Sequence, residues 1–224
     1  MTETTHEAST DLVTLPGTPL SDAVVNLIQS VEVRSVFNHS IRTYLFARLV
    51  AGRLALTVGR DYDDDLLFAA CAMHDIGVAS DGPHKQRFEV EGADRAAAFL
   101  VERGLPAADA EQVWQAIALH TSPGIAERRG TLCVLVREGV ALDFGGPLGA
   151  DHVDAVTDEQ AATLHTTYPR LDMVRSLTDA IVAQAAKHPK NAPRYAIPGE
   201  LLREREEFGR TRLEHACRSS RWGN

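Results

Sequence analysis

The chain has 224 residues, of which 44% are hydrophobic, and its formal net charge is −8. This length and composition suffice for one domain with a full hydrophobic core, so a second domain is not required. The negative charge argues against non-specific binding to nucleic acid or to an anionic membrane, because phosphate groups bind clustered Lys and Arg side chains. We therefore expect no nucleic-acid or membrane partner and a small-molecule substrate.

The N-terminus and the cysteines favour a cytoplasmic protein. Residues 1–20 lack periodicity and end near the turn Leu15-Pro16-Gly17, so we expect a flexible leader there. They lack the basic start and apolar run of a secretory signal, and no apolar stretch approaches membrane-spanning length. Cys71, Cys133 and Cys217 share no metal-type spacing, and a disulfide framework is not expected.

Helical patterns dominate from residue 20 onward, and convincing strand patterns are absent. The expected helices cover residues 21–29, 33–58, 66–79, 91–103, 107–119, 131–144, 158–165 and 171–187. Residues 188–224 carry Pro189, Pro193, Pro198 and then a charged run with few apolar anchors, so we expect a peripheral C-terminal segment. The predicted fold is all-α, with a single helical-bundle domain over residues 21–187.

Four of these helices carry a side chain of the metal-binding type on their apolar face, at about 100° of rotation per residue. The side chains are His39, His74 and Asp75, His120, and Asp143. A buried carboxylate must be paired or bound to a cation, because an isolated ion in apolar surroundings is strongly penalised. A single histidine on an apolar face is more often a hydrogen-bonded core residue. One shared metal ion would nevertheless explain His39, His74, Asp75 and Asp143 together.

A mixed set of nitrogen and oxygen donors suits one divalent transition metal ion. Zinc is the preferred prediction, with iron or manganese as alternatives.

The order of His39, the pair His74-Asp75 and then Asp143, all on helices, resembles the HD-domain superfamily of metal-dependent hydrolases. This resemblance covers about residues 20–187 and implies an HD-type helical bundle with these four residues as metal ligands. Three strings further resemble the cyanamide hydratase branch: residues 35–40 (SVFNHS), 73–77 (MHDIG) and 87–93 (RFEVEGA). That branch implies that metal-bound hydroxide adds to the carbon of cyanamide or of another small nitrile.

Further catalytic and substrate-binding candidates lie near these motifs. His120 is the first candidate for proton transfer, with Lys85, Glu89 and the ligand Asp75 as further candidates. A hydrogen-bonded core histidine is an equally good reading of His120, and a solvated loop is the simpler one for Lys85 and Glu89. We expect substrate contacts from Asn38, Phe37 and Phe88, although core packing would also explain the two aromatic residues.

Three other functions stay open. A phosphohydrolase of nucleotides or other phosphoesters needs cations for the phosphate oxygens, which Arg42, Lys85 and Arg128-Arg129 could supply. A di-iron oxygenase of the HD type would need extra histidines, for which His84 and His120 are candidates. A non-catalytic metal-containing binding module is the third alternative. A homo-oligomer is compatible with each of these functions.

Overall fold

The computed structural model describes residues 12–223 and confirms the predicted all-α fold. Within these residues the only β feature is an isolated bridge between Val58 and Tyr62. Residues 1–11 of the expected leader lie outside the described residues. The α-helices are α2 (Pro19–Val31), α3 (Arg34–Arg53), α4 (Asp64–Met73), α5 (Phe88–Glu102), α6 (Ala107–Leu119), α7 (Thr131–Asp143), α8 (Asp158–Thr167), α9 (Met173–Lys187), α10 (Ile197–Phe208) and α11 (Arg212–Arg218). Short 3₁₀ helices are η1 (Ile76–Val78), η2 (Ala126–Arg128), η3 (Val153–Ala155) and η4 (Pro189–Asn191).

Side-chain caps fix the starts of several helices. Thr18, Thr157 and Thr211 each form a capping box at the start of α2, α8 and α11. The Asp63 side chain accepts a hydrogen bond from the Leu66 amide at the start of α4. These caps satisfy backbone N–H groups that have no partner inside the helix, each stabilising it by about 1 kcal/mol.

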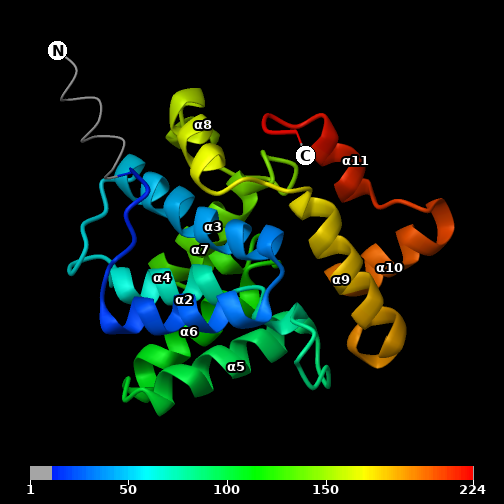
Figure 1. Cartoon of the computed structure of the whole chain (residues 1–224), viewed down its shortest axis with the longest axis horizontal. Coiled ribbons are helices and arrows are strands. Elements are labelled where there is room, and N and C mark those ends of the chain that lie inside the picture. The colour runs from blue at the N-terminus through cyan, green and yellow to red at the C-terminus, as the bar shows by residue number, and fades with distance from the viewer. Residues whose placement is uncertain (1–11, 224) are drawn as a thin grey trace.

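Helices α3 and α7 pack side by side at the centre of the bundle, with α4 and α6 against them and α5 against α6 (Figure 1). Gly139 allows the close approach of α7 to α3, because a Cβ atom there would lie 2.3 Å from the Thr43 carbonyl oxygen. This approach brings the C-terminal end of α7 against the side chains of α3. None of the helices in residues 12–223 is both long and apolar enough to cross a bilayer.

Two expected helices end earlier than predicted. The helix expected over 33–58 ends at Arg53, because the side chains of residues 52–55 are exposed and Ala55 has a positive φ of 54°. The helix expected over 66–79 ends at Met73. The chain then turns through η1 because Gly77 lies against α5, where a Cβ atom would stand 1.9 Å from the Phe88 carbonyl oxygen.

The C-terminal segment takes part in a second apolar cluster instead of lying apart from the core. Leu201 of α10 and Cys217 of α11 are buried there, together with residues of α7 and α9. Figure 1 shows α9, α10 and α11 beside the main bundle. Trp222 anchors the end of the segment, because its indole Nε1 donates a hydrogen bond of 2.5 Å to the Leu142 carbonyl of α7. The expected boundary at residue 187 therefore does not coincide with a break in packing.

Candidate metal centre

His74 and His120 occupy equivalent positions at the ends of two helices. Each is the C-terminal capping residue of its helix, α4 or α6. The Nδ1–H of His74 donates to the Cys71 carbonyl at 2.7 Å, and that of His120 donates to the Ile117 carbonyl at 2.6 Å. Both carbonyls belong to the last helical turn, where carbonyl groups have no helical partner. These hydrogen bonds fix each ring so that Nε2 faces the interior of the site.

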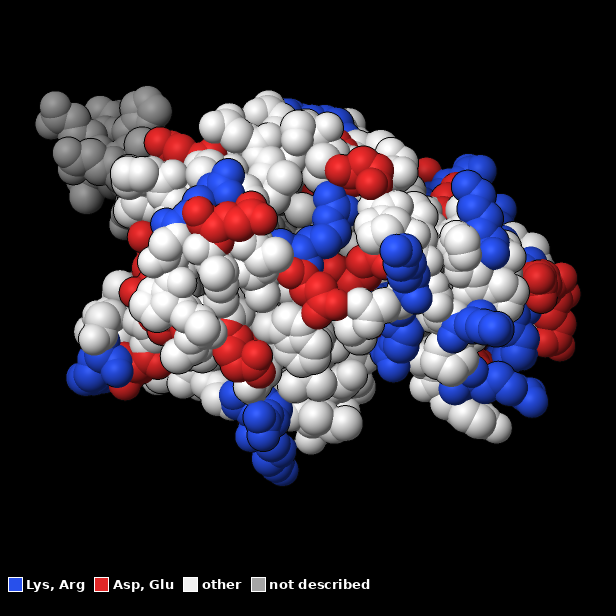
Figure 2. Space-filling model, turned by 90° about the horizontal axis from the view of Figure 1, so that it is seen from below, with Lys and Arg blue, Asp and Glu red and all other residues white. Residues whose placement is uncertain are grey.

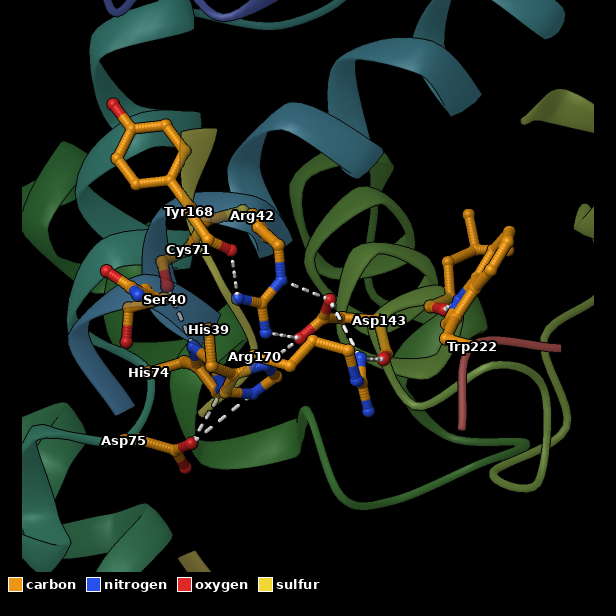
Figure 3. Close-up of polar contacts among 12 residues, drawn as sticks. His39, Ser40, Arg42, Cys71, His74, Asp75, Asp143, Tyr168, Arg170 and Trp222 are labelled. Carbon is orange, nitrogen blue, oxygen red and sulfur yellow. Dashed lines mark hydrogen bonds and ion pairs between the residues drawn. The ribbon is translucent and has the colours of Figure 1, made fainter. Parts of the chain in front are cut away.

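His39 projects from the middle of α3 and is oriented by Asp143, the last residue of α7. Its Nδ1–H donates to the Asp143 carboxylate at 2.6 Å, and its Nε2 lies 3.1 Å from the Nε2 of His74. The same carboxylate accepts two hydrogen bonds of 2.7 Å from the Arg42 guanidinium. Figure 3 shows Asp143 enclosed by Arg42, Arg170 and His39, with Asp75 on a different side of the His39 ring.

Asp75 lies where the three imidazole Nε2 atoms converge. Its Oδ2 is 3.1 Å from the Nε2 of His74 and 3.5 Å from that of His39, while its Oδ1 is 3.8 Å from the Nε2 of His120. One ligand atom each from His39, His74 and Asp75 lies within 4.8 Å of the others. Asp75 Oδ2 is buried and has no hydrogen-bond partner in the part of the chain that the structure describes.

These three residues fit a divalent transition metal ion. Two imidazole nitrogens and one carboxylate oxygen are donors that zinc, iron and manganese accept, and an ion would satisfy the unpartnered oxygen. The expected fourth ligand, Asp143, is not part of this group. Its carboxylate contacts Nδ1 of His39, whereas the group forms at Nε2. Asp143 thus orients His39 in this structure, and its assignment as a metal ligand stays a prediction.

The pKa values in the centre favour neutral imidazoles at two of the three positions. Burial lowers the pKa of His39 although the Asp143 carboxylate opposes that effect. Burial and the neighbouring His74 lower the pKa of His120 to about 4. Burial also disfavours protonated His74, but its contacts with Asp75 outweigh burial and raise the pKa of His74. Because metal ligands must be deprotonated, metal binding at His74 would compete with its protonation.

A cavity of about 120 Å³ adjoins the centre, large enough for several water molecules or a small organic molecule. His39, His74, Asp75 and His120 form part of its lining. Its remaining wall is mostly apolar and comes from α7, α9 and the C-terminal segment. The lining includes Phe88, Thr121, Arg137, Val140, Phe144, Leu148, Leu177, Ile181, Ile197, Leu201 and Leu213.

Of the other predicted site residues, one lines the cavity and four do not. Phe88 lines the cavity, as expected. Phe37 instead packs in the main core, and Asn38 donates a hydrogen bond to the Pro169 carbonyl, so neither contacts the cavity. Lys85 lies in the loop before α5, where its backbone N–H binds Glu91. Glu89 is buried behind the cavity wall and accepts a hydrogen bond of 2.9 Å from the Thr121 hydroxyl.

Several residues at the site were not predicted for the roles they have. Arg42, considered as a phosphate-binding cation, is instead fully buried against Asp143. His165 lies 3.8 Å from Asp143, and Arg137 and Thr121 line the cavity. Arg137 could have been noticed in the sequence, because it interrupts the apolar run of α7 one turn before Val140.

Comparison with family models gives one match, to the HD domain, over residues 36–206. The chain belongs to the HD-domain family. A search of curated proteins finds no match to this chain. The match includes the three grouped residues, Asp143 and most of α10. Membership implies a metal-dependent activity of the hydrolase type and a divalent metal, whose identity the family leaves open.

Proposed function

We propose that this HD domain is a hydratase or hydrolase that adds water to the electrophilic carbon of a small molecule, with nitriles such as cyanamide as the preferred class. The observation that carries the proposal is the convergence of three imidazole Nε2 atoms on Asp75 in the wall of a small, mostly apolar cavity. A divalent metal ion, for which zinc is preferred, supplies when bound an activated water nucleophile near neutral pH.

The residues of the centre have distinct roles in this proposal. His39, His74 and Asp75 hold the metal, and Asp143 fixes the orientation of His39 through its Nδ1–H. His120 is neutral near pH 7 and lines the cavity, so its Nε2 accepts a proton from water and returns it to the substrate nitrogen. Thr121 is held by Glu89 at the cavity wall and offers its hydroxyl oxygen to the substrate.

The cavity favours a small substrate over a phosphoester. Phosphate groups are bound by several cations or backbone amides, yet within residues 12–223 Arg137 is the single Lys or Arg in the lining. Lys85, Arg128 and Arg129 are exposed and are not among the lining residues. On the face drawn in Figure 2, Lys and Arg side chains gather mainly toward the right-hand end, while carboxylates dominate the middle of the face.

The di-iron alternative is less well supported than a single metal. His84 lies in the loop before α5, and its Nε2–H donates to the Ala79 carbonyl at 2.9 Å. It is absent from the cavity lining defined within the described residues. Among the residues that line the cavity, a second iron ion would then have His120 as its one additional histidine ligand. We also propose a cytoplasmic location, with which the three free and buried cysteines agree.

The test is turnover by protein loaded separately with zinc, iron or manganese. Cyanamide and short aliphatic nitriles are offered, with urea or amide formation as the readout, and a panel of nucleotides and phosphoesters is assayed for phosphate release. Asp75→Asn should abolish turnover and metal retention, whereas the surface variant Asp81→Asn should retain both. Phosphate release with no hydration would favour the phosphohydrolase, and ligand binding without any turnover would favour a binding module.

A further inference from the structure

Arg137 is a buried cation in the wall of the cavity and is not one of the proposed metal ligands. Only 3% of its surface is exposed, and it lies on the same face of α7 as Val140 and Phe144, which also line the cavity. Its Nη2 donates a hydrogen bond to the Leu148 carbonyl. Nε and Nη1 have no hydrogen-bond partner in residues 12–223. The nearest carboxylate oxygen in an ion pair with it, Glu127 Oε1, is 3.9 Å from Nε.

Of the two other arginines that are buried in residues 12–223, Arg42 shows that this fold can satisfy such a side chain. Arg42 uses Nε and Nη2 for the Asp143 carboxylate and Nη1 for the Tyr168 carbonyl. Arg170 also has unpartnered nitrogens, but its Nη1 lies 3.5 Å from that carboxylate and it does not line the cavity. A buried charge without a close partner is costly. Arg137 therefore differs by combining a poorly satisfied charge with a position in the lining.

We propose that Arg137 binds a carboxylate group of the substrate, at a position separate from the reacting carbon. The inference rests on the proposed function for the location of the reacting carbon, which is beside His39, His74 and Asp75. A guanidinium forms short, charge-assisted hydrogen bonds with a carboxylate, and these are about twice as strong as neutral ones. Nε and Nη1 of Arg137 are themselves buried and have no hydrogen-bond partner within residues 12–223, so contact with a carboxylate requires the guanidinium to turn toward the cavity.

The rest of the wall specifies the substrate further. Apart from the metal centre, Arg137 and two threonines, the residues in the lining are apolar, with Val140, Phe144 and Leu177 among them. One guanidinium matches one negative charge. A cavity of about 120 Å³ suits a small molecule. The substrate class is thus a short monocarboxylate whose electrophilic carbon is joined to the carboxylate by an apolar chain.

The first test uses unaltered, zinc-loaded protein and a pair of ligands that differ only in charge. Binding of 3-cyanopropanoate and of its neutral analogue 3-cyanopropanamide is measured by calorimetry. We expect the carboxylate to bind at least about tenfold more tightly, as is typical of a hydrogen bond to a charged group. Equal affinities would overturn the inference.

The second test repeats the pair with Arg137→Gln, Arg137→Lys and the exposed control Arg128→Gln. The ratio of the two affinities is independent of the folded fraction, since both ligands are measured on the same preparation. The ratio should fall to about one in Arg137→Gln, remain partly in Arg137→Lys and be unchanged in the control. If Arg137→Gln does not fold, the affinity ratios measured with Arg137→Lys and with the unaltered protein still test the inference.

Two outcomes distinguish this inference from the proposed function. A ratio that depends on Arg137 in a protein without nitrile turnover would uphold the carboxylate site and refute the hydratase. A ratio that is unchanged in Arg137→Gln but is lost when the metal is chelated would place the carboxylate on the metal and overturn the inference.

Discussion

Replacing Asp143 with Asn tests the distinction between a metal ligand and a residue that orients one. The Asp143 carboxylate accepts hydrogen bonds of 2.6 Å from His39 and of 2.7 Å from two nitrogens of Arg42. The amide keeps the shape of the side chain but loses the charge that balances buried Arg42. Removing one partner of a buried ion pair typically costs about 3–5 kcal/mol of folding free energy, and the variant should be destabilised by a similar amount.

We expect Asp143→Asn to reduce metal affinity less than the loss of a ligand does. Loss of a residue that orients a ligand lowers metal affinity by about 10–100-fold, whereas loss of a ligand removes most of the affinity. Zinc affinity is measured by competition with a chelator under conditions where Asp143→Asn remains folded, beside Asp75→Asn. We expect Asp143→Asn to retain measurable zinc binding and Asp75→Asn to lose it. Equal and complete loss in both folded variants would mean that Asp143 is itself a ligand.

Three other predictions concern stability. In the folded, metal-free protein the pKa of His120 is about 4, whereas in the unfolded chain it has its ordinary value of 6.5. Between these pH values the unfolded chain binds a proton that the folded protein does not, so the free energy of unfolding should fall as the pH drops from 6.5 to about 4. His120→Gln should remove up to about 1.4 kcal/mol per pH unit of this dependence, and equal slopes in urea unfolding would contradict it. Gly139→Ala should lower the free energy of unfolding by about 1–3 kcal/mol and weaken zinc binding, because the added Cβ atom moves α7 away from α3. Gly52 has open space around it, so Gly52→Ala should leave the free energy of unfolding unchanged or raise it. Equal unfolding midpoints of the two variants would refute this prediction. Trp222→Ala should increase hydrogen exchange in α10 and α11 but not in α3, and unchanged exchange would show that Trp222 does not anchor the segment.

The helices could be predicted because their signals are local. Caps, stop residues and apolar periodicity lie within each segment, and most predicted boundaries agree with the structure within a few residues. The same periodicity predicted the inward direction of His39 and His74, whereas Asp75 lies beyond the end of α4, at the start of η1. The sequence could not indicate which nitrogen of His39 meets Asp143, because that depends on the packing of α3 against α7, which are far apart in the chain.

The C-terminal segment and the cavity wall depended on long-range packing as well. Residues 197–218 have few apolar side chains. Three of them, Ile197, Leu201 and Leu213, line the cavity, and this role depends on tertiary packing that the local sequence does not indicate. Arg137 lies in an apolar helix, and neither composition nor spacing indicates that its charge is poorly satisfied. Tertiary contacts therefore determine the specificity of the site, while local signals determine its scaffold.

A crystal structure of the zinc-loaded protein, with the metal located by anomalous scattering, tests the metal centre most directly. One ion should be bonded to Nε2 of His39, Nε2 of His74 and the Asp75 carboxylate, with Asp143 still accepting the Nδ1–H of His39. A bond from the ion to an Asp143 oxygen, or a second ion in the cavity, would contradict the proposed centre.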